Sequence, residues 1–344
     1  MIASPYITQL SERLKSAPKP IVFPEGSDPR ILQAARAIAR EGIALPILLG
    51  DRAFIKRSAH ALDIKLEGIR IVEPEGSDRL NFFFQKMRQK ERLQRFSDKQ
   101  LSTLLLDSNY FGAMMLDGGE AAALISGATL ATSSALVPLF RTIPLEDGIQ
   151  TASSMLLLEM EENEHIGMHG LLFLADCSVI PNPTAQQLSD IALSTAKLAF
   201  LLRGEMPRVA FVSYSSHCAQ TNDPSVQKIQ QAFALTKERL TSLDFPIEID
   251  GDLQVDAALD LFVAEQKNIT GPVAGRANVL IFPDLHSGNI AAKMAQVVAN
   301  IRAYGPILTG LQKPAAEISR GSSAHDIFGT AVILCTLAKP SEAL

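Results

Sequence analysis

Short apolar runs alternate along the chain with amphipathic segments, and a polar junction rich in Gly, Ser, Thr or Asn separates each pair. The alternation predicts strands followed by helices, and therefore a mostly parallel sheet flanked by helices. Helices are expected from Pro29 to about Arg40, where Gly42 ends the first one, and from the junction 283–289 to about Tyr304. The expected strands are residues 20–24, 45–49, 121–126, 209–212 and 279–282.

Two segments do not follow this alternation of strands and helices. Residues 153–160 and 171–175 are apolar runs joined by the acidic loop 161–170, which predicts an antiparallel pair at the start of a second domain. Residues 86–100 are highly charged and predict one solvated helix. The length of 344 residues suits two domains. The fold class expected from the pattern is therefore α/β.

Composition narrows the class of protein. Hydrophobic residues make up 47% and charged residues 20%, which is typical of a well-buried globular chain. A net charge of -5 gives no basic field for nucleic acid or an anionic membrane, so an anionic ligand must be captured by local groups. No apolar stretch reaches the ~18 residues of a membrane span, and the N-terminus lacks a signal-peptide pattern. We therefore expect a cytoplasmic protein without nucleic-acid or membrane partners.

No metal site is expected. Cys177, Cys218 and Cys335 are far apart and odd in number, which fits neither a disulfide framework nor metal-ligand spacing. His165 and His169 stand four apart, a helical metal spacing, but the sequence GMHG around them favours a surface turn.

Polar junctions follow several expected strands, where α/β sheets bind their ligands. Residues 127–134, 213–222, 284–289 and 319–323 are rich in small and hydroxyl side chains. Helix N-termini offer backbone N–H groups and partial positive charge to phosphates. Helix capping is enough to explain any single junction, whereas four together favour a phosphate-bearing ligand. Neither GxGxxG nor GxxxxGK[ST] occurs, so the sequence supports neither a dinucleotide fingerprint nor a P-loop.

Several longer stretches, taken in order, carry a resemblance to a known family. They are FPEGSDPR (23–30), SGAT (126–129), FLADCSVIPNPTAQQLSDIA (173–192), SYSS (213–216), DGDLQVDAA (250–258), GPVAGRANVLIFPDLHSGNIAAK (271–293), GPILTGLQKP (305–314) and ISRGSSAHDI (318–327). Over nearly its whole length the chain resembles the phosphate acetyltransferase and phosphate butyryltransferase family.

The resemblance implies a fold and an activity. The fold is two α/β domains similar to isocitrate and isopropylmalate dehydrogenases, with residues 1–145 and 309–344 in a discontinuous first domain and residues 146–308 in the second. The active site is expected in the cleft between them. The implied activity converts acyl-CoA and phosphate to acyl phosphate and CoA, with acetyl the expected acyl group. Coenzyme A is then a substrate, no cofactor is needed, and the protein is expected to be a homodimer.

Catalytic residues are implied by the last matching stretch. The acid matching Asp326 is the base toward the CoA thiol, and the serine matching Ser319 hydrogen-bonds the sulfur or the intermediate. The arginine matching Arg320 neutralises charge on the carbonyl oxygen and phosphate, a task that suits a planar, permanently charged guanidinium. Spacing alone offers another interpretation, because Ser323 to Asp326 fits the S-x-x-[DE] capping pattern. The two roles are compatible.

Substrate-binding residues are expected at the other junctions. Arg88 matches an arginine that lies on the phosphate side of the family's active site. Without the resemblance, the sequence around Arg88 indicates only one more surface charge. The remaining candidates are Ser126, Gly127, Thr129, Ser213, Ser215, Ser216, Ser287 and Asn289.

Two positions depart from the family pattern. Val137 stands where the family has arginine, and His217, Cys218 and Ala219 follow SYSS where the family has glycine and serine. Arg141 lies one helical turn after Val137, so we hypothesise that it supplies the missing cation; the alternative is that it solvates the end of its helix. These departures leave open a second function, a catalytically weakened protein that binds acyl-CoA as a sensor or partner. The retained catalytic set favours the enzyme.

Overall fold

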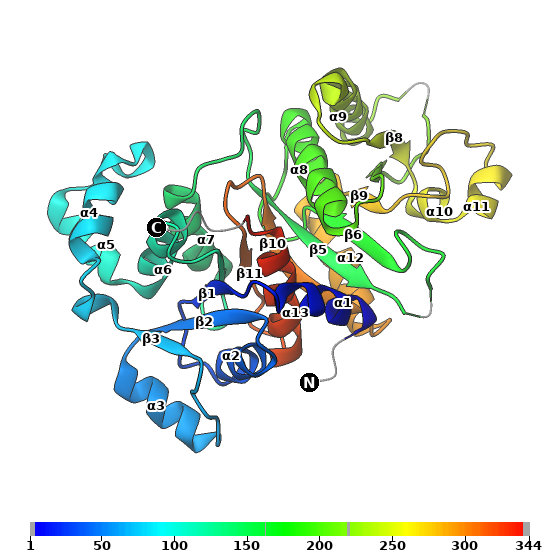
Figure 1. The fold of residues 1–344 in the computed structure, drawn as a ribbon. Coiled ribbons are helices and arrows are strands. Elements are labelled where there is room, and N and C mark those ends of the chain that lie inside the picture. The colour runs from blue at the N-terminus through cyan, green and yellow to red at the C-terminus, as the bar shows by residue number, and fades with distance from the viewer. Residues whose placement is uncertain (1–3, 162, 219–220, 340–344) are drawn as a thin grey trace. The chain divides into compact units, whose positions relative to one another are not determined.

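A computed structural model describes residues 4–161, 163–218 and 221–339 of the chain (Figure 1). The described residues form two compact units. Unit 1 comprises Met1–Pro144 and Leu311–Leu344, and unit 2 comprises Leu145–Gly310. Each unit is built from strands and helices that alternate along the chain, so the α/β fold class is confirmed.

Unit 1 is built on a parallel sheet. Its strands are β1 (Lys19–Phe23), β2 (Ala44–Leu49), β3 (Arg70–Val72), β4 (Ala123–Ser126) and β11 (Ala315–Glu317), in the order β3-β2-β1-β4-β11. Each neighbouring pair is parallel. The carboxyl ends of β1, β4 and β11 therefore lie side by side at one edge, where the loops that follow them meet.

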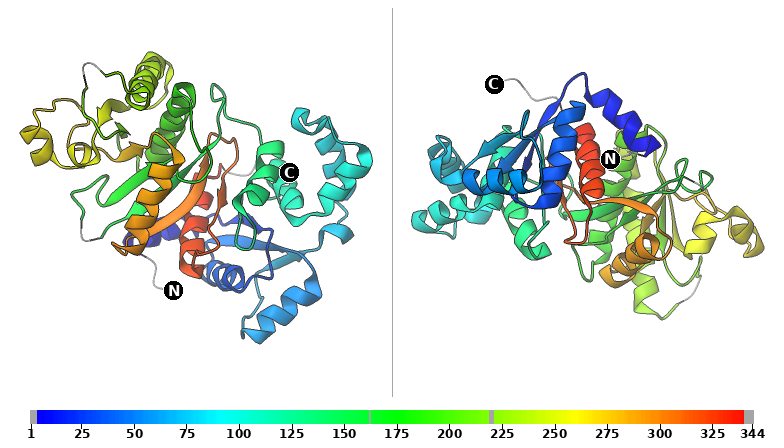
Figure 2. Two further views of the ribbon diagram at one scale, coloured as in Figure 1. Left: turned by 180° about the vertical axis from the view of Figure 1, so that it is seen from behind. Right: turned by 90° about the horizontal axis from the view of Figure 1, so that it is seen from below.

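Helices cover both faces of this sheet. α13 packs against α1 and α2, whereas α6 packs against α7 (Figures 1 and 2). The α2 helix begins where Asp28 caps its N-terminus and ends at Gly42, whose φ of 67° is left-handed. The helices are α1 (Pro5–Leu14), α2 (Pro29–Glu41), α3 (Arg52–Ala61), α4 (Leu80–Gln89), α5 (Asp98–Leu106), α6 (Ser108–Asp117), α7 (Thr132–Thr142) and α13 (Ala324–Leu337), with short 3-10 turns η1 (Pro74–Gly76) and η2 (Glu91–Leu93).

Unit 2 is built on a mixed sheet. Its strands are β5 (Ser153–Glu159), β6 (Leu171–Ala175), β7 (Arg208–Val212), β8 (Glu248–Leu253), β9 (Val279–Ile281) and β10 (Arg302–Thr309), in the order β10-β5-β6-β9-β7-β8. β5 pairs antiparallel with β6, as predicted, and also with β10. The remaining pairs, β6–β9, β9–β7 and β7–β8, are parallel.

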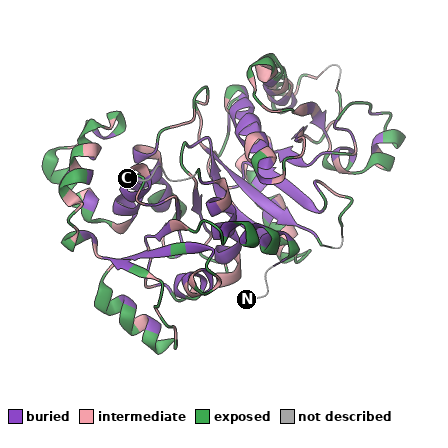
Figure 3. Cartoon of the chain, in the orientation of Figure 1, coloured by how far each residue is buried: buried purple, intermediate pink, exposed green. Residues whose placement is uncertain are grey.

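The helices of unit 2 lie on both faces of its sheet. α8 lies in front of the strands in Figure 1, and α12 lies in front of them in the view from behind in Figure 2. The buried strands form the centre of the unit (Figure 3). The helices are α8 (Ala185–Arg203), α9 (Pro224–Arg239), α10 (Val255–Leu259), α11 (Leu261–Gln266) and α12 (Leu285–Val297), with the 3-10 turn η3 (Leu240–Ser242).

Two predicted helices were wrong in extent. The helix expected to follow the junction 283–289 and to run to about Tyr304 ends at Val297, because Asn300 adopts a left-handed φ of 52° and β10 begins at Arg302. The single helix expected over residues 86–100 is divided among α4, η2 and α5. Ser97 starts α5 with a capping box, which places a helix boundary inside the charged run.

Candidate active site

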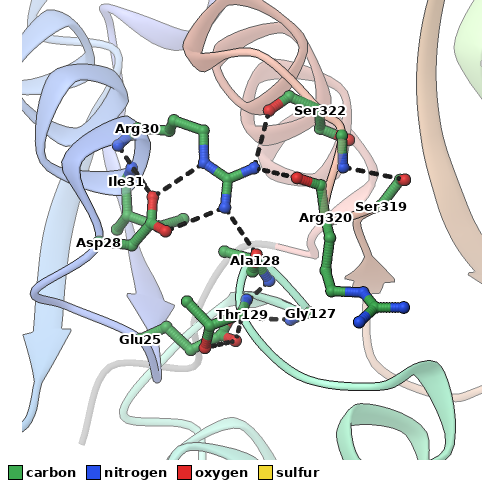
Figure 4. A network of polar contacts seen from close by, with 11 residues as sticks. Glu25, Asp28, Arg30, Ile31, Gly127, Ala128, Thr129, Ser319, Arg320 and Ser322 are labelled. Atoms are coloured by element: carbon green, nitrogen blue, oxygen red, sulfur yellow. Dashed lines mark hydrogen bonds and ion pairs between the residues drawn. The ribbon is translucent and has the colours of Figure 1, made fainter.

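Three loops of unit 1 meet beyond the carboxyl ends of adjacent strands (Figure 4). They are residues 24–28 after β1, 127–131 after β4 and 318–323 after β11. Parallel pairing of β1 with β4 and of β4 with β11 brings together segments separated by up to 290 residues, as the bond from Arg30 to Arg320 shows. We refer to these three loops as the junction cluster.

The carboxylate of Glu25 binds the loop after β4. Its Oε2 accepts the N–H groups of Gly127 and Ala128, both at 2.8 Å. Its Oε1 accepts the N–H of Thr129 at 2.7 Å and the Thr129 hydroxyl at 2.8 Å. Gly127 has a φ of +102°, and a Cβ there would lie 2.6 Å from the carbonyl oxygen of Ile318, so only glycine fits. The loop thus forms an anion-binding nest that holds a carboxylate of the same chain.

The guanidinium of Arg30 binds the carbonyl groups of the same cluster. Nη1 donates to the carbonyl oxygens of Arg320 at 2.6 Å and Ser322 at 3.1 Å. Nη2 donates to the carbonyl oxygen of Ala128 at 2.6 Å and to Asp28 Oδ2 at 2.9 Å. Burial alone would raise the pKa of Asp28, but the hydrogen bonds and charge of Arg30 hold that pKa below its ordinary value. Arg30 therefore ties all three loops together.

The expected catalytic residues lie on the loop after β11 and the start of α13. Ser319 is half-buried, and its Oγ accepts the N–H of Gly321 at 3.2 Å. The exposed side chain of Arg320 turns away from Arg30 in Figure 4 and has no partner among the residues that the structure describes. Asp326 forms the predicted capping box: its Oδ2 accepts the N–H of Ser323 at 2.8 Å, and its own N–H donates to Ser323 Oγ at 3.2 Å. The capping interpretation is confirmed, while the role as a base stays a prediction.

Ser126 completes the cluster at the end of β4. It is buried, and its Oγ has no hydrogen-bond partner within residues 4–161, 163–218 and 221–339. The structure thus brings Ser126, Gly127 and Thr129 together with the loop that carries Ser319 and Arg320.

The two other candidate arginines of unit 1 have different surroundings. Arg88, in the last turn of α4, forms a solvent-exposed ion pair with Asp98 at 3.4 Å. Arg141, in the last turn of α7, donates to the Tyr110 hydroxyl at 2.6 Å and lies 5.1 Å from the centroid of the Phe96 ring. The side chain of Val137 is 37% exposed on the same helix. Whether Arg141 replaces the cation missing at Val137 stays a prediction.

The hydroxyl loop after β7 is tied to β8 in unit 2. Asp252 accepts hydrogen bonds from Ser215 Oγ, from Gln230 Nε2 at 3.0 Å and from the N–H of Cys218 at 3.4 Å. Burial raises the pKa of Asp252, but these hydrogen bonds outweigh it and hold the pKa below its ordinary value. Ser213 Oγ lies 3.1 Å from Ser215 Oγ.

Ser216 and His217 complete this loop. Ser216 Oγ accepts the N–H of Gln254 at 2.9 Å. His217, at a left-handed φ of 46°, places Nε2 at 2.9 Å from Oδ1 of the buried Asp250. Ala219, one of the departures from the family pattern, lies outside the described residues.

Ser287 and Asn289 hold the start of α12. Ser287 N–H donates to the capping residue Asp284 at 2.8 Å, and Asn289 Nδ2 donates to the carbonyl oxygen of Cys177 at 2.9 Å. Their observed contacts are thus helix capping and loop anchoring; a substrate-binding role stays a prediction.

The family model described as phosphate acetyl/butaryl transferase matches residues 6–335 of this chain. The chain belongs to this family. It is 38% identical to the phosphate acetyltransferase of Acetivibrio thermocellus over 97% of this chain and 98% of the relative. The structure matches that of a phosphotransacetylase from Streptococcus pyogenes with a TM-score of 0.87 at 32% identity, covering 98% of this chain and 99% of the other.

A more distant solved structure carries information on the fold alone. A Salmonella typhimurium protein of the 4-hydroxythreonine-4-phosphate dehydrogenase kind matches with a TM-score of 0.52 at 12% identity, over 94% of this chain and 100% of its own. This match supports the expected likeness to a dehydrogenase fold. No helix in the described part of the chain is both long and apolar enough to cross a membrane.

Sequence reasoning missed the two residues that organise the junction cluster. Glu25 and Arg30 both belong to the matching stretch FPEGSDPR, but no role was inferred for them. Their position directly after a strand was an available signal. In the same way, Asp250 and Asp252 belong to the matching stretch DGDLQVDAA, and their contacts with the loop after β7 were not foreseen.

Proposed function

We propose that this chain transfers an acyl group, preferentially acetyl, between coenzyme A and inorganic phosphate. The observation that carries the proposal is the family membership over residues 6–335. The retained Ser319, Arg320 and Asp326 support catalysis over a purely binding function. Arg30 holds the backbone of the loop that carries Ser319 and Arg320, and Asp326 lies in the capped first turn of α13.

Asp326 is the proposed base. One of its oxygens, Oδ2, caps α13, while Oδ1 has no hydrogen-bond partner among the described residues. One carboxylate can therefore hold the helix start with one oxygen and accept the thiol proton of CoA with the other. The thiolate formed then attacks the acyl carbon of acyl phosphate, the bond from that carbon to the phosphate oxygen breaks, and phosphate leaves.

In the direction of acyl phosphate synthesis, a phosphate oxygen attacks the thioester carbon. The carbonyl oxygen gains negative charge until the carbon–sulfur bond breaks, and the electron pair stays on the sulfur. The guanidinium of Arg320, which no described residue binds, is the proposed counter-charge for that oxygen and for the phosphate. Ser319 Oγ already accepts the N–H of Gly321, so its own proton can be donated to the sulfur or the intermediate. The step needs no metal or prosthetic group, and coenzyme A enters as a substrate.

We also propose a homodimer formed through α12. This helix exposes an apolar stripe of Ile290, Met294, Val297 and Val298, of which Val297 is 79% exposed. The spacing places these side chains on one face, and Lys293, which donates to Gln296, is the single Lys, Arg, Asp or Glu among residues 285–298. Such a stripe can face its own copy across a two-fold axis.

The size of the particle in solution tests this contact. Val297→Glu should shift the light-scattering mass from dimer to monomer, because it places like charges in a self-contact. Phe54→Glu, at an equally apolar position on α3 of unit 1 that is 51% exposed, is the matched control and should stay dimeric. A dimer that persists in the Val297 variant contradicts the assignment of this surface.

A cytoplasmic location is part of the same proposal. Cys177 and Cys335 are free thiols and both are buried, an arrangement typical of reducing compartments. Fractionation of the producing cells should recover the activity with the cytosol.

An assay of CoA release tests the function. Acetyl-, propionyl- and butyryl-CoA are each supplied with phosphate, and acyl phosphate is trapped as the hydroxamate. We expect phosphate-dependent turnover with all three and the highest kcat/KM for acetyl-CoA. Tight acyl-CoA binding without turnover would contradict the proposal and favour the sensor.

A further inference from the structure

We propose that Glu25 is a positioning residue for acyl transfer, which fixes the loop after β4 and, through Arg30, the backbone that carries Arg320. This inference rests on the proposed function. It assigns a part in the reaction to a side chain that has no catalytic or substrate-binding role above, and that acts on the reaction only through its neighbours.

The loop after β4 depends on a carboxylate from another segment. The residue before α7, Ala131, provides no side-chain cap, and the N–H groups of residues 127–129 point to a common centre instead of to a side chain of their own loop. Glu25, 104 residues before Thr129, fills that centre with both of its oxygens. Charge-assisted bonds from N–H groups to a carboxylate are among the stronger hydrogen bonds in proteins. The conformation of this loop is therefore set by Glu25.

Arg30 transmits that conformation to the loop after β11. Its Nη2 donates to the carbonyl oxygen of Ala128, and Glu25 accepts the N–H of the same residue (Figure 4). Glu25 and Arg30 therefore bind the two backbone polar groups of one residue. Its Nη1 holds the carbonyl oxygen of Arg320. The charge of Glu25 also helps to raise the pKa of Arg30, after the larger effect of its hydrogen bond with Asp28. A change at Glu25 thus reaches the Arg320 backbone through Arg30.

The contacts of Glu25 also occupy the N–H groups that could otherwise bind an anion. Backbone N–H groups in a nest of this kind bind phosphates readily, but here Glu25 occupies them. The guanidinium of Arg320 has no partner among the described residues and stays available for a phosphate. Glu25 therefore occupies the N–H groups of residues 127–129, and Arg320 is left available for the phosphate.

Steady-state kinetics of Glu25→Ala, with formate as a replacement carboxylate, test this assignment. We expect kcat to fall about 10- to 100-fold, the scale on which a misplaced catalytic group slows a reaction, while KM for acetyl-CoA changes less than about twofold. Formate should restore kcat in a saturable manner, because the open nest binds it. High phosphate should inhibit the variant by the same route.

The controls separate positioning from folding. Glu25→Gln keeps the size of the side chain, replaces one acceptor by a donor that opposes the loop N–H groups, and should lose kcat without regaining it in formate. It also serves as the test if Glu25→Ala does not fold. Glu75→Gln, at an exposed acid of unit 1, should match the wild type in every measurement, with and without formate.

Three results would overturn the inference: normal kcat in both Glu25 variants, a loss of kcat in Glu25→Ala that formate does not restore, or equal formate activation of the wild type. Absence of turnover in the wild type would contradict the proposed function itself, and it is therefore distinct from the three results that contradict the role of Glu25.

Discussion

Asp326 caps α13 and is also the proposed base, so one substitution should lower turnover strongly while it changes stability little. Asp326→Asn keeps a carbonyl oxygen that can accept the Ser323 N–H now 2.8 Å from Oδ2, so the helix cap survives. The free energy of unfolding should fall by less than about 1 kcal/mol, and Tm by less than about 4 °C. The amide cannot take a proton from the CoA thiol, so turnover should fall by about 10²-fold or more, equivalent to about 2.7 kcal/mol in the barrier.

Ser323→Ala is the complementary control for this prediction. It removes the hydroxyl that accepts the Asp326 N–H at 3.2 Å and leaves the carboxylate intact. It should lose about 1 kcal/mol of stability and keep near-normal turnover. The assay is CoA-thiol acetylation by acetyl phosphate, with urea unfolding on the same preparations. Near-normal turnover in Asp326→Asn would refute the base assignment, as would an equal loss of turnover in Ser323→Ala.

Three further changes test other parts of the account. Arg320→Ala should lower kcat and raise KM for phosphate, because it removes a charge-assisted contact that is strongest in the transition state; weaker CoA binding with unchanged kcat would contradict that role. Arg141→Ala should raise KM for phosphate more than KM for CoA if Arg141 supplies the missing cation, and an unchanged phosphate KM would limit it to its contact with Tyr110. The pKa of Asp28 is lowered from 3.8, so the ionised carboxylate contributes stability above about pH 4, and this contribution is lost as pH falls through the lowered pKa. Asp28→Asn should therefore destabilise the protein in urea unfolding at pH 7, and the difference from wild type should shrink below pH 4; a constant difference would contradict the ionic contribution.

The local signals in the sequence predicted β1, α2 and β4 beside the junction cluster, but not β11, and they predicted the pairing of β5 with β6 in unit 2. Asp28 and Gly42 mark the two ends of α2 because a side-chain cap and a left-handed residue act within one turn of the backbone. The apolar runs that became β5 and β6 were predicted as an antiparallel pair for the same reason: both strands and their short connection lie within one stretch of chain.

The interior of the site could not be predicted in the same way. The bonds from Glu25 to Gly127 and from Arg30 to Arg320 join residues 102 and 290 positions apart, and only the order of β1, β4 and β11 brings them together. The capping box of Asp326 was visible in its spacing, whereas the lack of a partner for its Oδ1 among the described residues depends on which side chains surround it. The prediction that α12 would reach Tyr304 was wrong for a similar reason, because the pairing of β10 with β5 overrides a short helical pattern.

Isotope transfer from phosphate tests the central claim most directly. The enzyme is incubated with acetyl-CoA and inorganic phosphate that carries oxygen-18 in every position, and the acetyl phosphate formed is analysed by mass spectrometry beside a titration of released CoA. Direct attack of phosphate on the thioester predicts one acetyl phosphate for each CoA, with all the labelled oxygens retained, including the oxygen that bridges carbon and phosphorus. Release of CoA without acetyl phosphate, or acetyl phosphate with an unlabelled bridging oxygen, would contradict the account.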